Sequence, residues 1–232
     1  MEIFLDTANL GEIEHWLAHG LVDGVTTNPS ILLKEGGHDI ERRAREIARL
    51  IDPRPLSVEV YSNDHQEMLT QAHEFAAWAP NIVIKIPVIN EQGESSLDVV
   101  KTLVDGGTRV NMTACMSFGH VVGGAKAGAT YISLFAGRMA DEGQDAPRVI
   151  RQSVEWLKLW GYPSKILVGS IREAVNIQDA ALAGAHVITA PPQFLEKFID
   201  HQYSRATVRQ FNEDARKALV KVEDLRLTVS AD

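Results

Sequence analysis

The stretch Asn81-Ile-Val-Ile-Lys-Ile-Pro-Val-Ile89 decides how the fold of this sequence is interpreted, because it is apolar at nearly every position. A strand with one wet face alternates apolar and polar residues, whereas a continuous apolar run is typical of a parallel strand that is covered on both faces. Seven further short apolar runs predict strands elsewhere in the chain. Together they give eight predicted strands, at 3–6, 22–26, 56–60, 82–86, 108–113, 130–134, 165–168 and 186–189.

The segments between these runs have helical periodicity. Leu97, Val100 and Val104 form one apolar stripe, which stops at Gly106, and similar stripes occupy the other gaps. Eight strand-then-helix units predict an α/β fold, a single (β/α)8 TIM barrel. The alternative, an open doubly wound sheet, usually has a glycine-rich turn after its first strand, and Asp6-Thr-Ala-Asn9 stands there instead.

The chain continues past the eighth unit. Pro191-Pro192 opens a short helix, and an additional C-terminal helix is predicted at about 203–223. The last residues, 224–232, are expected to fray. We therefore predict one TIM-barrel domain over 1–232 that ends in a helical extension.

Composition narrows the classes of partner. The 232 residues are 45% hydrophobic and 23% charged, typical of a globular domain that needs no disulfide or metal to be stable. A net charge of −8 with no basic block predicts no nucleic-acid partner. No apolar run approaches the roughly 20 residues of a membrane helix, so no membrane partner is expected. A single cysteine, Cys115, and the lack of a signal-peptide pattern predict a cytoplasmic location.

Polar residues follow or end most of the predicted strands. In a TIM barrel the active site lies at the carboxyl ends of the strands, where the βα loops begin. A purely structural barrel does not need so many polar groups there, and this distribution predicts a catalytic mouth. The candidates are Asp6, Asn28, Glu59, Lys85, Asn111, Thr113, Ser133, Ser170 and Arg172.

Lys85 carries the most chemical information, because apolar residues flank it on both sides. Burial disfavours the ammonium form and lowers the pKa of a lysine, which makes a neutral amine available to attack a carbonyl and form a Schiff base. The structural alternative is a lysine at a strand end that reaches solvent or pairs with a carboxylate. The pattern alone leaves both open.

Asp6 and Glu59 are the candidate proton carriers. Carbon–carbon cleavage through a Schiff base needs a base for a hydroxyl proton and an acid/base for the carbinolamine steps. The alternative for Asp6 is to cap the first helix, with Asn9 competing for that position. The alternative for Glu59 is a structural ion pair with Lys85.

Two further segments predict substrate contacts. Asn28, in Thr26-Thr-Asn-Pro-Ser30, could hold a substrate hydroxyl or simply form an Asn-Pro turn. Ser170 and Arg172, at the start of the helix after the seventh strand, could bind an anion, and Arg138 could add a second positive charge. The alternative there is a serine helix cap beside a surface arginine.

Metal ligands are sparse. His15 and His19 share a helical face, but no third ligand is apparent, so we predict neither a metal nor another cofactor. A metal-dependent sugar-phosphate isomerase and a non-catalytic ligand-binding barrel remain as other functional classes. Neither class needs a lysine buried in the fourth strand.

Six segments in order along the chain resemble those of a known family, the small transaldolases, which include the bacterial fructose-6-phosphate aldolases. The most specific are the Thr-Thr-Asn-Pro-Ser and Ile-Lys-Ile-Pro segments. The full set is Ile3-Phe-Leu-Asp-Thr-Ala-Asn9, Asp23-Gly-Val-Thr-Thr-Asn-Pro-Ser30, Val83-Ile-Lys-Ile-Pro87, Ala127-Gly-Ala-Thr-Tyr-Ile-Ser133, Gly137-Arg138 and Gly169-Ser-Ile-Arg172.

The resemblance implies a role for each candidate. Lys85 would form the Schiff base and Asp6 would take the C4-hydroxyl proton, while Glu59 and Thr113 would position a catalytic water. The implied substrate-binding residues are Asn28, Asn111 and Ser133 for the dihydroxyacetone part, Arg138, Ser170 and Arg172 for the phosphate, and Thr26 and Phe135 beside them. The partners would be small-molecule sugar phosphates, and the family's pentamers or decamers imply a homo-oligomer.

Two positions separate the branches of this family. Transaldolases are similar to one another in having glutamate and phenylalanine where this chain has Glu59 and Phe135, whereas the aldolases tend to have glutamine and tyrosine. The resemblance therefore implies a transaldolase that moves a dihydroxyacetone unit from a fructose 6-phosphate or sedoheptulose 7-phosphate type of donor to an aldose phosphate. The alternatives are an aldolase that releases free dihydroxyacetone and a related enzyme for an anionic sugar such as a sulfosugar.

Overall fold

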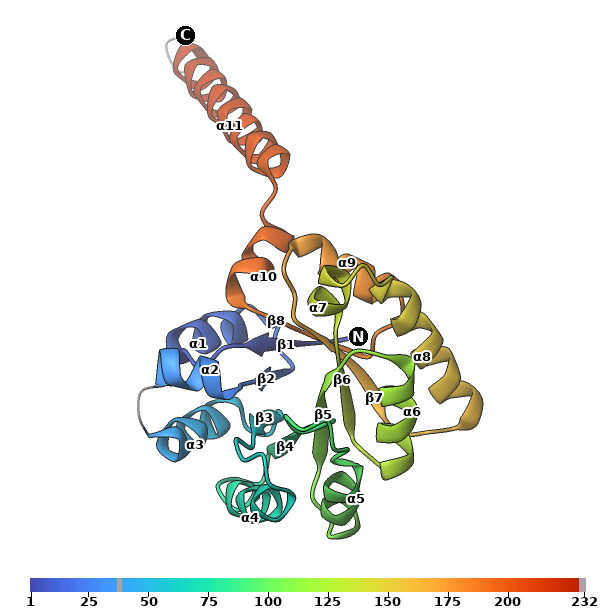
Figure 1. Ribbon diagram of the computed structural model, residues 1–232. Helices are drawn as coiled ribbons and strands as arrows, with labels where there is room; N and C mark the ends of the chain where they lie inside the picture. The colour runs from blue at the N-terminus through green and yellow to red at the C-terminus, as the bar shows by residue number, and fades with distance from the viewer. Residues whose placement is uncertain (37–38, 230–232) are drawn as a thin grey trace. The chain divides into compact units, whose positions relative to one another are not determined.

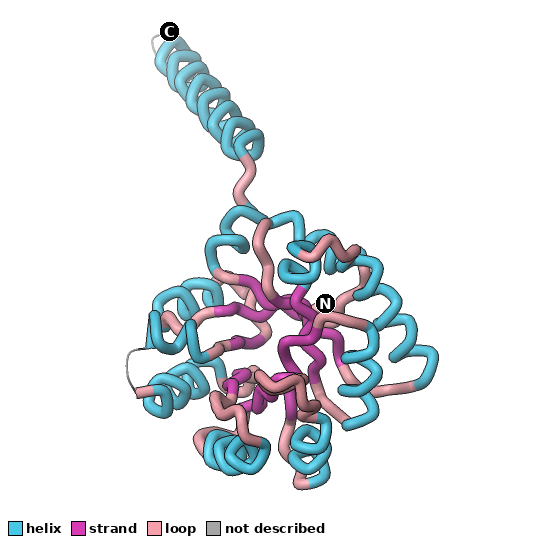
Figure 2. The backbone as a smooth tube through the Cα atoms, viewed as in Figure 1, coloured by secondary structure: helices cyan, strands magenta, loops and turns pink. Residues whose placement is uncertain are grey.

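The strands of the computed structural model, which describes residues 1–36 and 39–229, lie side by side in one closed barrel (Figure 2). Neighbouring strands are parallel and follow chain order, and β8 pairs with β1 to close the ring. The (β/α)8 fold is thus confirmed, and each predicted strand overlaps an observed one. The strands of the described residues are β1 Glu2–Asp6, β2 Gly24–Thr26, β3 Leu56–Glu59, β4 Ile82–Pro87, β5 Val110–Cys115, β6 Tyr131–Phe135, β7 Lys165–Gly169 and β8 Val187–Ala190.

The helices that lie between consecutive strands in the sequence surround the barrel (Figure 1). Side-chain caps begin several of them: Asn9 accepts a hydrogen bond from the Glu12 N–H at the start of α1, and Ser117 does the same for His120 at α6. The bounds are α1 Leu10–Ala18, α2 Pro29–Ile31, the π-helix η1 Leu32–Gly36, α3 Ile40–Ile51, α4 His65–Ala76, α5 Leu97–Asp105, α6 Phe118–Ala127, α7 Ala136–Asp141, α8 Ala146–Trp160, α9 Ala174–Leu182, α10 Pro192–Ile199 and α11 Gln202–Val229.

The barrel interior is layered because alternate residues of a strand point to the same face. An apolar cluster made of Phe4, Val83, Tyr131, Leu167 and Val187 fills the end at which the strands begin. The Phe4 ring packs edge-on against Tyr131, with 5.8 Å between the ring centroids. This cluster forms the floor of the barrel, and the residues two positions further along each strand face inward above it.

Two compact units make up the chain, Met1–Leu195 and Glu196–Asp232, and the barrel belongs to the first. That the whole of 1–232 is one domain stays a prediction. The expected helix at 203–223 is confirmed as α11, but α11 begins one residue earlier and continues to Val229. The expectation that 224–232 fray stays a prediction: 224–229 continue α11, and 230–232 lie outside the described residues. No described helix combines the length and apolarity needed to cross a membrane.

Candidate active site

A small cavity of about 170 Å³ lies above the apolar floor, at the carboxyl ends of the strands. Every predicted site residue except Glu59 and Arg172 lines it. Asp6, Lys85, Ser133 and Thr189 each stand two positions after a member of the apolar floor, which is why they point inward. The complete lining is Asp6, Thr26, Asn28, Lys85, Asn111, Thr113, Ser133, Phe135, Arg138, Leu167, Gly169, Ser170 and Thr189.

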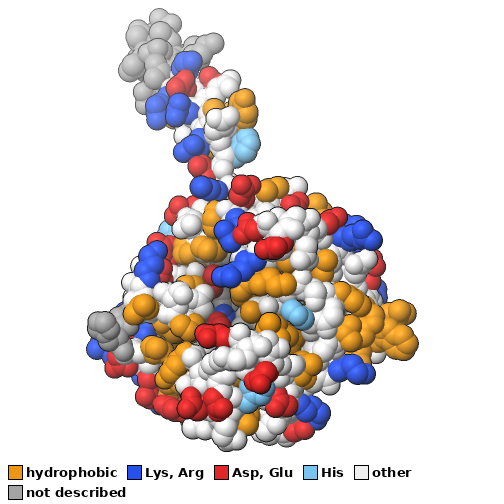
Figure 3. Space-filling view, in the orientation of Figure 1, with side chains coloured by type: hydrophobic (Ala, Val, Ile, Leu, Met, Phe, Trp, Pro, Cys, Tyr) orange, Lys and Arg blue, Asp and Glu red, His pale blue; other side chains and the backbone are white. Residues whose placement is uncertain are grey.

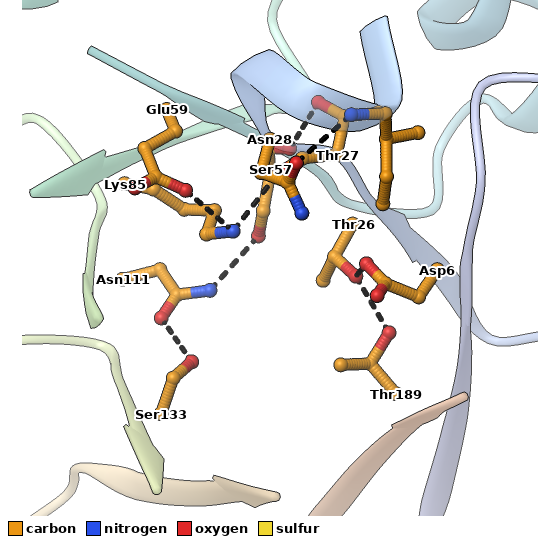
Figure 4. A network of polar contacts seen from close by, with 11 residues as sticks. Asp6, Thr26, Thr27, Asn28, Ser57, Glu59, Lys85, Asn111, Ser133 and Thr189 are labelled. Carbon is orange, nitrogen blue, oxygen red and sulfur yellow. Dashed lines mark hydrogen bonds and ion pairs between the residues drawn. The ribbon is translucent and has the colours of Figure 1, made fainter. Parts of the chain in front are cut away.

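Lys85 is buried at one side of this cavity (Figure 4). Its Nζ lies 2.9 Å from Glu59 Oε2 and donates a hydrogen bond of 2.8 Å to the backbone carbonyl of Thr27. Of the alternatives raised by the sequence, the ion pair with Glu59 is the arrangement in this structure. Because the two groups are in direct contact, a proton can pass between them without an intervening water.

Asp6 lies on the opposite side of the cavity, in a second hydrogen-bonded group (Figure 4). The Thr26 hydroxyl donates to Asp6 Oδ1 at 2.6 Å, and the Thr189 and Thr26 hydroxyl oxygens are also 2.6 Å apart. Because Thr26 gives its only hydroxyl proton to the carboxylate, Thr189 must be the donor to Thr26. Burial raises the pKa of Asp6, against the opposing effects of the Lys85 charge and the Thr26 hydrogen bond. Asn9, and not Asp6, caps α1.

A third group of hydrogen bonds lies beside Lys85, on β3, β5 and β6. Asn111 Nδ2 donates to Ser57 Oγ at 3.2 Å, and the Ser133 hydroxyl donates to Asn111 Oδ1 at 2.6 Å. Thr113 is also buried here, and its Oγ1 has no hydrogen-bond partner among the described residues. The β5 register then shifts between Met112 and Cys115, and Ala114 has a left-handed φ of 58°. This bulge leaves a free buried hydroxyl at the cavity wall.

Asn28 forms the turn that the sequence offered as one alternative, and its role in substrate binding stays a prediction. Its Oδ1 accepts a hydrogen bond of 2.9 Å from the Ile31 N–H and so caps the short helix α2. The other end of the amide, the Nδ2 group, points into the space between Lys85 and Thr26 in Figure 4. The cap fixes the orientation of the amide and leaves a donor for a substrate oxygen.

The positive charges gather on the side of the cavity formed by β6 and β7. Arg138, on α7, places its guanidinium 5.8 Å from the centre of the Phe135 ring. Ser170 has a φ of 57° and does not cap α9, because Glu173 occupies the cap position. Its carbonyl accepts a hydrogen bond of 3.0 Å from the Gly137 N–H, and a Cβ at Gly137 would lie only 2.1 Å from that oxygen. A glycine is therefore required for α7 to approach β7 this closely.

Arg172 lies outside the central cavity. Its Nη2 pairs with Asp141 Oδ2 at 2.9 Å, and both side chains are exposed. Figure 3 shows that Lys and Arg side chains are exposed at several places on this face of the protein. Arg172 lines a neighbouring cavity of about 460 Å³ together with Arg138, so the two guanidinium groups share that space. Among the described residues, no group of three or more His, Cys, Asp or Glu side chains is placed to hold a metal ion.

Comparison with known proteins decides the family. Residues 3–231 match the family model described as Transaldolase/Fructose-6-phosphate aldolase. The "Probable transaldolase" of Anaeromyxobacter dehalogenans strain 2CP-C is 41% identical over 217 residues, which cover 94% of this chain and 97% of that protein. The "Probable transaldolase" of Dehalococcoides mccartyi strain ATCC BAA-2266 / KCTC 15142 / 195 is 38% identical over 214 residues, with 92% and 97% covered. The chain belongs to the transaldolase/fructose-6-phosphate aldolase family.

Solved structures support the barrel independently of this family. The thiamine phosphate pyrophosphorylase from Pyrococcus furiosus superposes with a TM-score of 0.56 at 12% identity, over 82% of this chain and 85% of that one. At this identity the likeness concerns the fold alone.

A larger outer cavity of about 680 Å³ adjoins the inner one. Asp6, Lys85 and Phe135 line both this cavity and the inner one, so the two spaces meet at the predicted catalytic residues. Glu59 faces the outer cavity, as do Met116 from the loop after β5 and Gln193 from the first turn of α10.

Several site residues of this family member were missed by sequence reasoning. Thr189 follows Val187 by two positions, and the same spacing from Phe4 to Asp6 and from Val83 to Lys85 would have indicated it. Ser57 precedes Glu59 by two positions and is likewise detectable. Glu35 lines the outer cavity from a π-helix, and no strand periodicity predicts it.

Proposed function

We propose that this chain is a transaldolase that moves a dihydroxyacetone unit from a ketose phosphate to an aldose phosphate through a Schiff base on Lys85. The observation that carries the proposal is the placement of one buried lysine between two carboxylates, with Glu59 in contact and Asp6 across the cavity. The family membership supports it. The route needs no metal and no organic cofactor, because the lysine itself supplies the electron sink.

The first half of the reaction joins the donor to Lys85. The ammonium passes a proton to Glu59, and the neutral amine attacks the C2 carbonyl to give a carbinolamine. Glu59 then returns the proton to the departing hydroxyl, which leaves as water and gives the iminium. The unpaired hydroxyl of Thr113, which lines the same cavity as Lys85, supports a role in holding that water.

The second half breaks and remakes a carbon–carbon bond. The Asp6 carboxylate accepts the C4-hydroxyl proton, the C3–C4 bond breaks, and its electron pair moves into the iminium to form an enamine. The first aldehyde leaves, the enamine attacks the carbonyl carbon of the acceptor, and Asp6 returns the proton to the new alkoxide. The enamine nitrogen becomes an iminium again, and water adds to it by the reverse of the first half, which releases the new ketose and frees Lys85. Burial supports the role of Asp6, because a carboxylate whose pKa is raised is a stronger base.

Two features favour transfer over simple aldol cleavage. The inner cavity of about 170 Å³ can hold the three-carbon unit at Lys85, and the outer cavity of about 680 Å³ leaves room for one aldehyde to be exchanged for another. Phe135 borders both cavities and has no hydroxyl group with which to protonate the enamine. The competing function is an aldolase that releases free dihydroxyacetone.

The substrates we propose are sugar phosphates. Arg138 and Arg172 share a cavity beside the site, and Ser170 lines the central one, so the phosphate would lie on that side. We also propose a homo-oligomer, a pentamer or decamer, on the family resemblance, and a cytoplasmic location on the single cysteine and the lack of a signal-peptide pattern. We propose neither nucleic acid nor membrane as a partner. Light scattering on the purified chain measures the stoichiometry.

Borohydride trapping tests the central step. Reduction in the presence of fructose 6-phosphate is expected to fix a three-carbon adduct on Lys85, and Lys85→Met is the matched control. An unmodified Lys85 in an active sample would exclude the Schiff base. Rapid release of glyceraldehyde 3-phosphate without any aldose phosphate acceptor would instead identify an aldolase.

A further inference from the structure

Glu35 reaches back from η1 to the turn that follows Asp6. Its Oε2 accepts a hydrogen bond of 2.7 Å from the Thr7 hydroxyl and one of 2.9 Å from the Ala8 N–H. The Thr7 oxygen in turn accepts a hydrogen bond of 3.2 Å from the Asn9 N–H. One carboxylate oxygen therefore organises the whole β1–α1 turn, from a segment 28 positions away in the sequence.

This turn depends on such an acceptor, because Thr7 and Ala8 are buried. A buried N–H or hydroxyl that loses its partner carries a desolvation penalty of about 1–3 kcal/mol, and the backbone moves to relieve it. Asp6 is the last residue of β1 and the immediate neighbour of Thr7. Any movement of the turn therefore changes the direction of the Asp6 carboxylate.

The location of Glu35 also argues for function over simple packing. Its side chain lines the outer cavity together with Asp6, and it belongs to a π-helix, a rare form of helix that is often found at functional sites. A glutamate that only anchored a loop would not need to share the cavity of the base.

We propose that Glu35 is a positioning residue for Asp6. It acts through the two hydrogen bonds that it accepts from the turn Thr7–Ala8. The inference rests on the proposed function, in which Asp6 is the base for the C4-hydroxyl proton. Glu35 itself does not touch the reacting atoms in this scheme.

Glu35 also contributes to the charge around Asp6. The groups that face this carboxylate are Lys85 from β4, Glu59 from β3, Glu35 from η1 and the Thr26 hydroxyl from β2. Lys85 and the Thr26 hydrogen bond lower the pKa of Asp6, whereas the two glutamates raise it. Removal of the Glu35 charge therefore lowers the pKa of Asp6.

Two substitutions separate the effect of the Glu35 charge from that of its hydrogen bonds to Thr7 and Ala8. Glu35→Gln keeps an oxygen that accepts the same hydrogen bonds but removes the charge, so the acidic limb of the kcat/KM pH profile is expected to move to lower pH. Glu35→Ala removes both, and misplacement of the base is expected to lower kcat by about 10- to 100-fold with little change in KM for the donor. Glu14→Gln, an exposed carboxylate on α1, is the matched control and is expected to change neither.

The outcomes divide cleanly. The proposed function stands if the parent protein gives the Lys85 adduct and Asp6→Asn loses activity. If Glu35→Gln then has a wild-type pH profile and Glu35→Ala a wild-type kcat, the role of Glu35 is overturned while the proposed function remains. Absence of the adduct in the parent protein refutes the proposed function itself. If Glu35→Ala does not fold, Thr7→Val decides, because it removes the hydrogen bond from Thr7 to Glu35 and leaves the charge in place: a lower kcat with little change in KM supports the proposal, and a wild-type kcat refutes it.

Discussion

Replacement of Glu59 by glutamine should destabilise the barrel through Lys85. The side chains of Lys85 and Glu59 are only 6% and 19% exposed, and their atoms are 2.9 Å apart. Glu59→Gln leaves a buried ammonium with neutral acceptors alone, the Thr27 carbonyl and the new amide oxygen.

The expected cost follows from the burial of the pair. Breaking a buried ion pair by removing one partner typically costs about 3–5 kcal/mol. Because the Thr27 hydrogen bond remains, we expect the lower end, about 3 kcal/mol. For a chain of this size each kcal/mol lowers Tm by about 2–4 °C, so Glu59→Gln should lower Tm by about 6–12 °C.

A double-mutant cycle tests this reasoning. Lys85→Met with Glu59→Gln removes both charges, and replacement of a buried pair by neutral groups is often close to neutral for stability. The double variant should therefore recover most of the loss, with a coupling energy of about 2–3 kcal/mol in urea unfolding. Additive single effects, or a Glu59→Gln protein as stable as the parent, would show that the pair is not buried as a charged unit.

Three more substitutions test separate parts of the site. Asp6→Asn should lower kcat by about 10²- to 10⁴-fold. The stability of Asp6→Asn relative to the parent should also rise between about pH 4.5 and about pH 7.5. The pKa of Asp6 in the folded parent is raised above its ordinary 3.8, so the parent loses stability as pH rises through the folded pKa and Asp6 becomes charged, whereas the asparagine of the variant does not titrate. Urea unfolding at both pH values measures it, and a pH-independent difference would count against a buried, titrating Asp6. Gly137→Ala would place a Cβ 2.1 Å from the Ser170 carbonyl, so it should cost about 1–3 kcal/mol and raise KM for phosphorylated donors. Gly119→Ala, whose Cβ would meet only an atom at 3.7 Å, is the control, and equal effects of the two would contradict the close-approach argument. Phe135→Tyr should raise the ratio of acceptor-free cleavage to transfer by roughly tenfold or more, measured as dihydroxyacetone released, if a phenol hydroxyl protonates the enamine; an unchanged ratio would remove Phe135 from the explanation of transfer.

Much of the site was predictable because it lies on strands whose ends are defined by the sequence. A barrel brings the carboxyl ends of all strands to one mouth, so residues far apart in the chain, such as Asp6 and Lys85, could be grouped from the strand pattern alone. Side-chain pairing within the mouth could not be predicted in the same way. The sequence raised the contact of Lys85 with Glu59 as one alternative but could not choose it, and it did not indicate the contact of Arg172 with Asp141, because both depend on rotamers and loop geometry. Glu35 was beyond sequence reasoning because a π-helix and a tertiary hydrogen bond place it.

The inward direction of Lys85 shows what the neighbouring strands add to the sequence of one strand. In β4 both faces are apolar, so periodicity alone does not say whether Lys85 points into the barrel or out toward the surrounding helices. The residues Ile82, Ile84, Ile86 and Val88 pack in the large core cluster, whereas Val83 belongs to the floor inside the barrel. The register of β4 against its neighbouring strands decides which of its residues point into the barrel. Lys85 pairs with Glu59 on β3 and with Asn111 on β5, so three polar residues lie at one level of the barrel. A slip of one residue in β4 would turn Lys85 into the apolar layer around the barrel. The cost of burying that unpaired charge selects the register, and the same register assembles the site.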